Sequence, residues 1–323
     1  MNATPRTQRK EESAAVLRPR LMALAIAAAL SASGPAFALP SGGQVVAGAA
    51  TIVRDGNALR VTNTPGAIIN WASFSVGALE SVRFDQQSAL SAVLNRVTGN
   101  EASALYGQLT SNGRVWLINP NGILFGAGAR IDLPSFVAST LDVSNADFAA
   151  GKMNFLAGAN PGGIRNEGTI ETSGNLYLVA PDIENSGVIR SSTGDVLLAA
   201  GREVRLVDGA HPDIQVVVSA PTDKAVNLGR IAGRSVGLMG ALLEQRGTVE
   251  ATAVEVDDHG RIVFRGNQTT LAAGSTTTAS GASGGTVSID STGDTLVEGH
   301  IAASGSAGNG GRIEVLGDRV AVF

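Results

Sequence analysis

Beyond residue 40 the chain is a series of short apolar segments, each closed by glycine, asparagine, aspartate or serine. Helical spacing of apolar residues is nearly absent there, and β-branched residues are frequent. Short β-branched runs separated by turn residues are typical of strands joined by tight turns. We therefore predict an all-β protein, with strands at Val115–Ile118, Leu176–Val179, Val196–Leu198, Ile214–Val218, Arg261–Phe264 and Arg319–Phe323.

From residue 164 onward the turn residues recur at a regular spacing. Ile164–Ile170 returns as Ile183–Ile189, an offset of 19 residues, with asparagine and glycine at matching places. A weaker copy has its asparagine at Asn227, 42 residues after Asn185, and we interpret this interval as two periods. The segments 274–285 and 304–311 are rich in glycine and serine, and we expect them to be wide turns of further coils.

A repeat of roughly 20 to 25 residues with short strands is one coil of a solenoid. Stacked coils bury their Val, Ile and Leu side chains in ladders about 4.8 Å apart. A leucine-rich repeat is the rival fold, but its leucine template and its helical arm are missing from this chain. We predict a right-handed parallel β-helix with an N-terminal cap. The repeated asparagines either adopt a positive φ in a turn or bond to the next coil through the amide.

The first 38 residues have the pattern of a cleaved export signal. Basic residues precede a twelve-residue apolar run, Leu21–Ala32, which is followed by a Ser-Gly-Pro breaker and the small residues Ala36 and Ala38. As a helix this run would reach about 18 Å, too short for a hydrocarbon core of about 30 Å. We predict cleavage after Ala38, which makes Leu39 the first residue of the mature chain.

The composition argues against a nucleic-acid-binding protein and against a protein held together by disulfides. The formal net charge is −4, and the predicted signal holds five basic but only two acidic residues, so the mature chain is more acidic still. This balance argues against nucleic acid as a partner, because nucleic-acid binding needs a clustered basic face. Cysteine is absent, so no disulfide framework holds the exported chain together.

One block of sequence, Gln86–Ser144, is more specific than the repeats. At its centre Asn119-Pro120-Asn121-Gly122 is close to an ideal type I turn, because proline fixes φ at the second position and glycine occupies the fourth. Ile118 and Ile123 flank the turn and can point into a core. A single turn of this kind is common, so the identity of the protein depends on the whole block.

The block resembles the N-terminal secretion domain of filamentous-haemagglutinin-type two-partner-secretion exoproteins, especially the high-molecular-weight adhesin branch. The resemblance is strong over residues 42–160 and generic beyond. It implies a signal peptide over 1–38, a secretion-domain core over 39–160 and β-helical repeats over 161–323 that continue the same solenoid. The segments that match in order and spacing are Leu94–Gly99, Gly107–Leu109, Asn112–Val115, Ile118–Ile123 and Ala138–Asp142.

The resemblance also implies a function. It implies export by the Sec translocon, recognition by periplasmic modules of an Omp85-type outer-membrane β-barrel, and release to the surface or medium of a Gram-negative bacterium. The expected role is an adhesin or haemagglutinin, or a truncated form of one, with a host-cell or surface glycan as receptor. Turn chemistry alone accounts for the central turn, so Arg96 is the better candidate for contact with the transporter. The residues that match the secretion motifs are Asn95, Arg96, Asn119, Pro120, Asn121 and Gly122.

The alternative is a β-helix that binds or processes polysaccharides. Its catalytic sites need clustered carboxylates, often with calcium, and a base. Here Asp257-Asp258 is not repeated at coil spacing and is typical of a polar turn, and His211, His259 and His300 occur singly. We therefore expect no catalytic residue, metal or cofactor. One sequon, at Asn267, leaves glycosylation open.

Overall fold

Buried and exposed residues alternate along the strands, and this alternation closes the chain into coils. In β16 (Thr169–Thr172) and β19 (Val188–Ser191) the isoleucines Ile170 and Ile189 are fully buried, whereas the residues on either side face outward. These strands come from successive coils and pair in parallel, so Ile170 stacks on Ile189.

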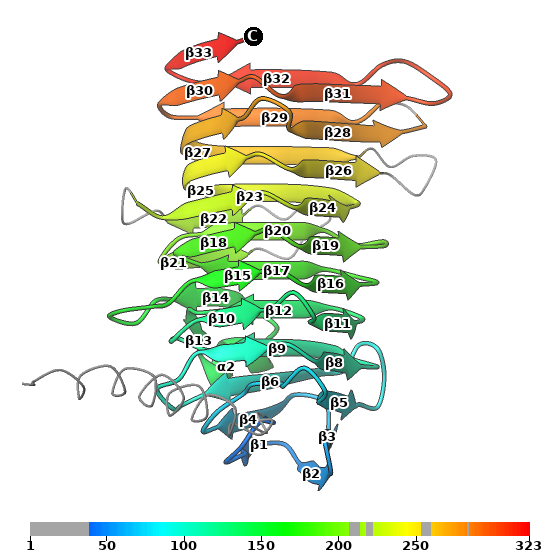
Figure 1. The fold of residues 1–323 in the computed structure, drawn as a ribbon, viewed down its shortest axis with the longest axis vertical. Coiled ribbons are helices and arrows are strands. Elements are labelled where there is room, and N and C mark those ends of the chain that lie inside the picture. Colours follow the sequence, from blue (N-terminus) through cyan, green and yellow to red (C-terminus); the bar gives the residue numbers. More distant parts are fainter. Residues whose placement is uncertain (1–38, 207–213, 218–221, 253–259, 283) are drawn as a thin grey trace, which may run out of the picture. The chain divides into compact units, whose positions relative to one another are not determined.

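The structure is a computed structural model that describes residues 39–206, 214–217, 222–252, 260–282 and 284–323. It confirms the predicted parallel β-helix (Figure 1).

The solenoid has three faces, each a ladder of parallel strands. The first face comprises β4 (Ala67–Trp71), β6 (Ala92–Val97), β9 (Arg114–Ile118), β12 (Phe136–Ser139), β17 (Leu176–Ala180), β20 (Val196–Ala200), the first halves of β25 (Ser235–Gln245) and β27 (Arg261–Leu271), β29 (Thr286–Ser291) and β32 (Arg312–Leu316). The second face comprises β7 (Ser103–Leu105), β10 (Ile123–Phe125), β15 (Ile164–Asn166), β18 (Asp182–Asn185), β23 (Lys224–Asn227), the second halves of β25 and β27, β30 (Asp294–Val297) and β33 (Arg319–Val322). The third face comprises β5 (Ser81–Asp85), β8 (Gln108–Ser111), β11 (Arg130–Leu133), β16, β19, β24 (Arg230–Gly233), β26 (Thr248–Thr252), β28 (Thr276–Gly281) and β31 (His300–Gly305).

Antiparallel strands cap the N-terminal end of the solenoid, as predicted. The strand β1 (Gln44–Ala47) pairs antiparallel with β4. The hairpin of β2 (Ala50–Asp55) and β3 (Ala58–Asn63) is antiparallel, and β3 then pairs in parallel with β5. These strands cover backbone edges that the first coil would otherwise expose. Leu39, the predicted start of the mature chain, is buried in the same core.

Two excursions leave the solenoid and pack on the outside of its first face. The first contributes β13 (Asp142–Val143), α2 (Asn145–Ala149) and β14 (Met153–Leu156), and the second contributes β21 (Glu203–Leu206) and β22 (Ile214–Val217). Their strands form a four-stranded antiparallel sheet. It covers a second apolar cluster, in which Trp116 of β9 meets Phe148 of α2 edge to face, with ring centroids 5.2 Å apart. Within the described residues no helix is long and apolar enough to cross a membrane.

The second excursion accounts for the 42-residue interval between Asn185 and Asn227. Asn185 and Asn227 lie opposite each other on β18 and β23, which are neighbouring strands. The interval is therefore one coil lengthened by the excursion, and the reading as two periods was wrong. The expectation of a wide turn over 274–285 was also partly wrong, because residues 276–281 form β28 and bury Thr277 and Ala279.

The repeated asparagines form a ladder of amides inside the second face. Asn166, Asn185, Asn227 and Gln245 stack in register, and each is at most 1% exposed. The three asparagine amides each donate to the side-chain oxygen of the next residue, at 2.7, 2.8 and 2.7 Å. No residue other than glycine has a positive φ in the described part of the chain. Of the two roles left open by the sequence, the asparagines therefore take the amide bond to the next coil.

We expect the Asn185→Ala variant to lower the free energy of unfolding by about 2 kcal/mol or more, because Asn166 and Asn227 would each lose a buried partner. Urea denaturation of residues 39–323, followed by far-UV circular dichroism, measures this. The matched control is Asn267→Ala, since Asn267 is exposed and its side-chain oxygen accepts a hydrogen bond from the Thr292 hydroxyl on the surface. An unchanged unfolding midpoint in Asn185→Ala would show that the ladder adds no stability.

Candidate secretion motif

The turn between β9 and β10 is formed by Asn119–Gly122, as the sequence predicted. The backbone N–H of Gly122 donates to the carbonyl oxygen of Asn119 at 3.1 Å. Gly122 has a φ of 120°, a conformation that residues with a Cβ atom rarely adopt. A side chain at this position would therefore strain the turn.

The Asn119 side chain is fully buried and ties this turn to the preceding coil. Its amide nitrogen donates to the Glu101 carbonyl at 3.0 Å and to the Ser103 hydroxyl at 2.9 Å. Its oxygen accepts from the backbone and side-chain nitrogens of Asn121, both at 3.0 Å. Asn121 in turn donates to the Gly99 carbonyl at 2.8 Å. The two asparagines thus fix the turn against residues about one coil earlier.

Asn95 performs a similar function inside the first face. Its side chain is fully buried, and its oxygen accepts from the indole nitrogen of Trp71 at 3.0 Å. Its amide nitrogen donates to the carbonyl of Trp116 at 3.3 Å. Because Trp71, Asn95 and Trp116 lie on β4, β6 and β9, this one side chain connects three successive coils.

Arg96 follows Asn95 on β6 and its side chain reaches the first excursion. Its Nε donates to Asp142 Oδ1 at 2.8 Å, its Nη1 to Asn145 Oδ1 at 2.8 Å and its Nη2 to the Val143 carbonyl at 2.6 Å. The Arg96 side chain is only 15% exposed. We call these contacts the Arg96 clamp, because they hold β13 and the start of α2 against the solenoid. Ser144 caps α2 by accepting from the backbone of Asp147.

The clamp joins two of the segments that carry the family resemblance, Leu94–Gly99 and Ala138–Asp142. A family model described as the TPS secretion domain, for two-partner secretion, matches residues 36–321 of this chain. The chain belongs to the TPS secretion domain family. Exoproteins of this family pass through the periplasm of Gram-negative bacteria, are translocated by an outer-membrane transporter partner, and are secreted or exposed at the surface. They act in secretion and adhesion.

Known relatives agree with this assignment of a TPS secretion domain. A heme/hemopexin-binding protein of Haemophilus influenzae strain Rd is 35% identical over 173 residues, which cover 50% of this chain and 19% of that protein. A second Haemophilus influenzae protein of the same name is 42% identical over 77 residues, or 24% of this chain and 8% of the relative. The chain thus spans under a fifth of these relatives. The crystal structure of the HMW1 secretion domain from Haemophilus influenzae aligns with a TM-score of 0.72 at 29% identity, over 88% of this chain and 96% of that one.

The TPS secretion domain uses most of its motif residues internally. Of the six residues that match the motifs, Asn121 is exposed, Pro120 is half-buried, and the other four are buried or held in the clamp. Sequence reasoning found Arg96 but missed Val143 and Asn145 as its partners. Asp142 lies in one of the segments that resemble the family. Its pairing with Arg96, 46 positions earlier, could not be predicted from the spacing of residues along the chain.

Some predicted positions lie outside the described residues, namely Ala36 and Ala38 of the signal site, Asp257, Asp258, His211 and His259. His300 begins β31. Within the described residues no group of three or more His, Asp or Glu side chains could hold a metal ion. Asp294 accepts hydrogen bonds from Arg319, and this contact raises the pKa of that guanidinium above its ordinary value.

We expect Arg96→Ala to release β13 and α2 from the solenoid while the parallel core stays folded. Losing three charge-assisted hydrogen bonds should speed amide exchange over residues 142–149 about tenfold or more. Hydrogen–deuterium exchange with mass spectrometry measures this, and exchange over β17 and β20 should not change. The control is Arg114→Ala, an exposed arginine at the start of β9. Equal exchange over 142–149 in both variants would contradict the clamp.

Proposed function

We propose that this chain is an adhesin-type exoprotein whose secretion domain is recognised by periplasmic modules of an Omp85-type outer-membrane β-barrel. The family match over residues 36–321 supports this exoprotein role over that of a polysaccharide-processing enzyme. The main observation in support of a role for the motif in secretion is the Arg96 clamp, which brings two of the motif segments into contact. A host-cell or surface glycan is the receptor that we propose for the adhesive activity.

We infer that Arg96 acts in secretion by positioning the first excursion. The sequence favoured Arg96 as the residue that contacts the transporter, but its Nε, Nη1 and Nη2 atoms all donate within the chain. Asn95 and Asn119 are fully buried, so they too act through the fold. Asn121 is the exposed member of the motif and thus the better candidate for direct contact.

We propose that the chain reaches the periplasm through the Sec translocon after cleavage between Ala38 and Leu39. The basic n-region and short apolar run of residues 1–38 support this route. The absence of cysteine supports the next step, since no disulfide can lock the chain before it crosses the outer membrane. The buried position of Leu39 agrees with a mature domain that starts there.

Secretion is expected to depend on the transporter. The full chain is produced in a Gram-negative host with and without the gene of its outer-membrane partner, and the medium is probed for residues 39–323. We expect release only with the partner, and N-terminal sequencing of the released protein should begin at Leu39. Equal release without the transporter would overturn the proposed function.

The same assay separates positioning from contact. We expect Arg96→Ala to reduce secretion together with the altered amide exchange over 142–149. Arg96→Lys should not restore it, because lysine lacks the planar fork that reaches three acceptors. Arg114→Ala is the control. Normal amide exchange in Arg96→Ala combined with lost secretion would instead make Arg96 a contact residue.

A further inference from the structure

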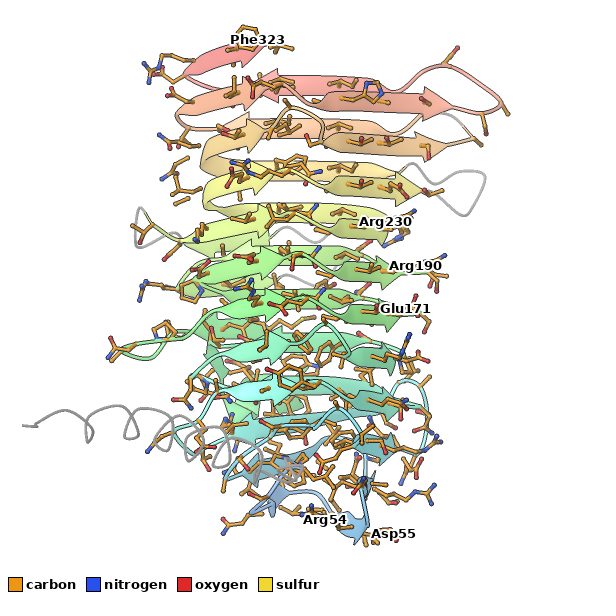
Figure 2. The ribbon with its side chains drawn as sticks, viewed as in Figure 1. Arg54, Asp55, Glu171, Arg190, Arg230 and Phe323 are labelled. Carbon is orange, nitrogen blue, oxygen red and sulfur yellow. The ribbon has the colours of Figure 1, made fainter. Side chains whose placement is uncertain are left out.

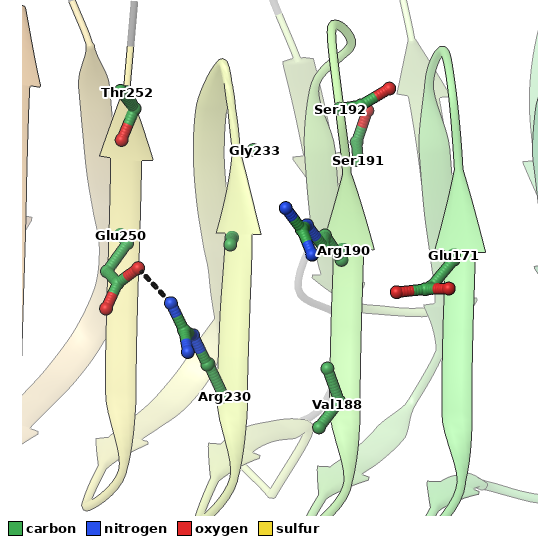
Figure 3. A pocket seen from close by; sticks show the side chains of 10 residues that line it. Glu171, Val188, Arg190, Ser191, Ser192, Arg230, Gly233, Glu250 and Thr252 are labelled. Atoms are coloured by element: carbon green, nitrogen blue, oxygen red, sulfur yellow. Dashed lines mark hydrogen bonds and ion pairs between the residues drawn. The ribbon is translucent and has the colours of Figure 1, made fainter.

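A shallow trough of about 430 Å³ crosses the outer surface of the third face (Figure 3). It is open because β24 has an alanine, Ala232, where the neighbouring strands have long side chains. Ala232 lies in register with Arg190 on β19 and with Glu250 on β26. Gly233, the next residue of β24, also lines the trough. The floor of the trough is therefore backbone and a single methyl group, between two walls of charged side chains.

Arg190 is the group on one wall that is available to a ligand. It lies in register with Glu171 on β16, but neither side chain has a hydrogen-bond or ion-pair partner within the described residues. In Figure 3 the Arg190 side chain leans away from Glu171 toward β24, and Glu171 points toward β19. A guanidinium with its five N–H donors thus borders the open trough, beside a carboxylate that can accept hydrogen bonds.

The opposite wall is closed by an ion pair. Arg230 of β24 contacts Glu250 of β26 at 2.6 Å, and Figure 3 shows this pair at the far side from Glu171. Hydroxyl groups of Ser192 and Thr252 also line the trough. Figure 2 shows that Glu171, Arg190 and Arg230 follow one another along the same edge of the solenoid, on the outer surface.

This set of groups selects for a particular ligand chemistry. A guanidinium fork binds a carboxylate or sulfate through two parallel hydrogen bonds. The Glu171 carboxylate and the two hydroxyl side chains suit a ligand that is rich in hydroxyl groups. Val188 is the one sizeable apolar side chain in the lining, and no aromatic ring is present, so an apolar peptide would bury little surface. We propose that the trough binds an acidic saccharide, with its acid group on Arg190 and hydroxyl groups on Glu171.

The site deepens the proposed adhesive role by giving it a ligand class, and its biological use depends on that role. Binding itself can be measured on the secreted, purified chain. Arg190 lies on the third face and the Arg96 clamp on the first, so we expect Arg190→Ala to be secreted at the normal level. Failure of the secretion assay would therefore refute the proposed dependence on the transporter, whereas failure of the binding assay would refute the saccharide site.

The test is isothermal titration calorimetry on purified residues 39–323. The probes are an oligosaccharide with alternating glucuronate units, a sulfated oligosaccharide of the same length, a neutral maltose oligomer and inorganic sulfate. We expect the two acidic saccharides to bind, the neutral oligomer not to bind, and sulfate to bind far more weakly. Arg190→Ala should weaken saccharide binding about tenfold. Ala232→Gln should abolish it by filling the trough without changing the charge.

The control is Arg130→Ala, which removes an exposed arginine of β11 on the same face but outside the trough. Binding in this variant should not change, and circular dichroism should show all three variants folded. An equal loss in Arg130→Ala would overturn the site in favour of a general charge effect. Tight binding of inorganic sulfate would show a simple anion site, and no binding of either acidic saccharide would refute the proposal.

Discussion

The structure depends on parallel, in-register pairing between successive coils. This pairing places each inward side chain directly above its counterpart in the coil before, so the core is a stack of columns. Polar side chains in such a column keep their hydrogen bonds when each can donate to one neighbour and accept from another. The asparagine amide meets this condition, because it has a donor and an acceptor on one short side chain. In the column of Asn185, the residues beyond the ladder are Phe125 at one end and Leu271 at the other.

The same pairing explains why the secretion motif is so largely internal. Asn95 and Asn119 satisfy buried backbone and side-chain groups of neighbouring coils, at positions where an unpaired polar atom would be costly. Arg96 directly follows Asn95 on β6. The alternation of side chains along this strand therefore turns Arg96 outward, toward the first excursion. Neighbouring positions on one strand thus stabilise two different layers, the β-helix core and the sheet outside it.

The excursions give the first face a character that the other faces lack. Large apolar residues such as Trp116 and Tyr177 point outward there and would be exposed on a bare solenoid. The four-stranded sheet covers them, and the Arg96 clamp fixes the end of that sheet. Among the described residues no such sheet covers the third face, and its outer surface carries charged and hydroxyl side chains that line the trough. The covered first face thus carries the Arg96 clamp, and the third face carries the trough that we propose as a saccharide site.

The sequence by itself determined the strands, the 19-residue repeat, the Asn119–Gly122 turn and the family, because these depend on local alternation, turn chemistry and a contiguous block of motifs. It did not determine how strands pair across an excursion, so the interval from Asn185 to Asn227 was misread. Nor did it show the partners of Arg96 or the trough above Ala232. Those features depend on which strands become neighbours once the coils stack, and residues in contact there are separated by 20 to 49 positions. Only the tertiary structure decides such contacts, since spacing along the chain does not record them.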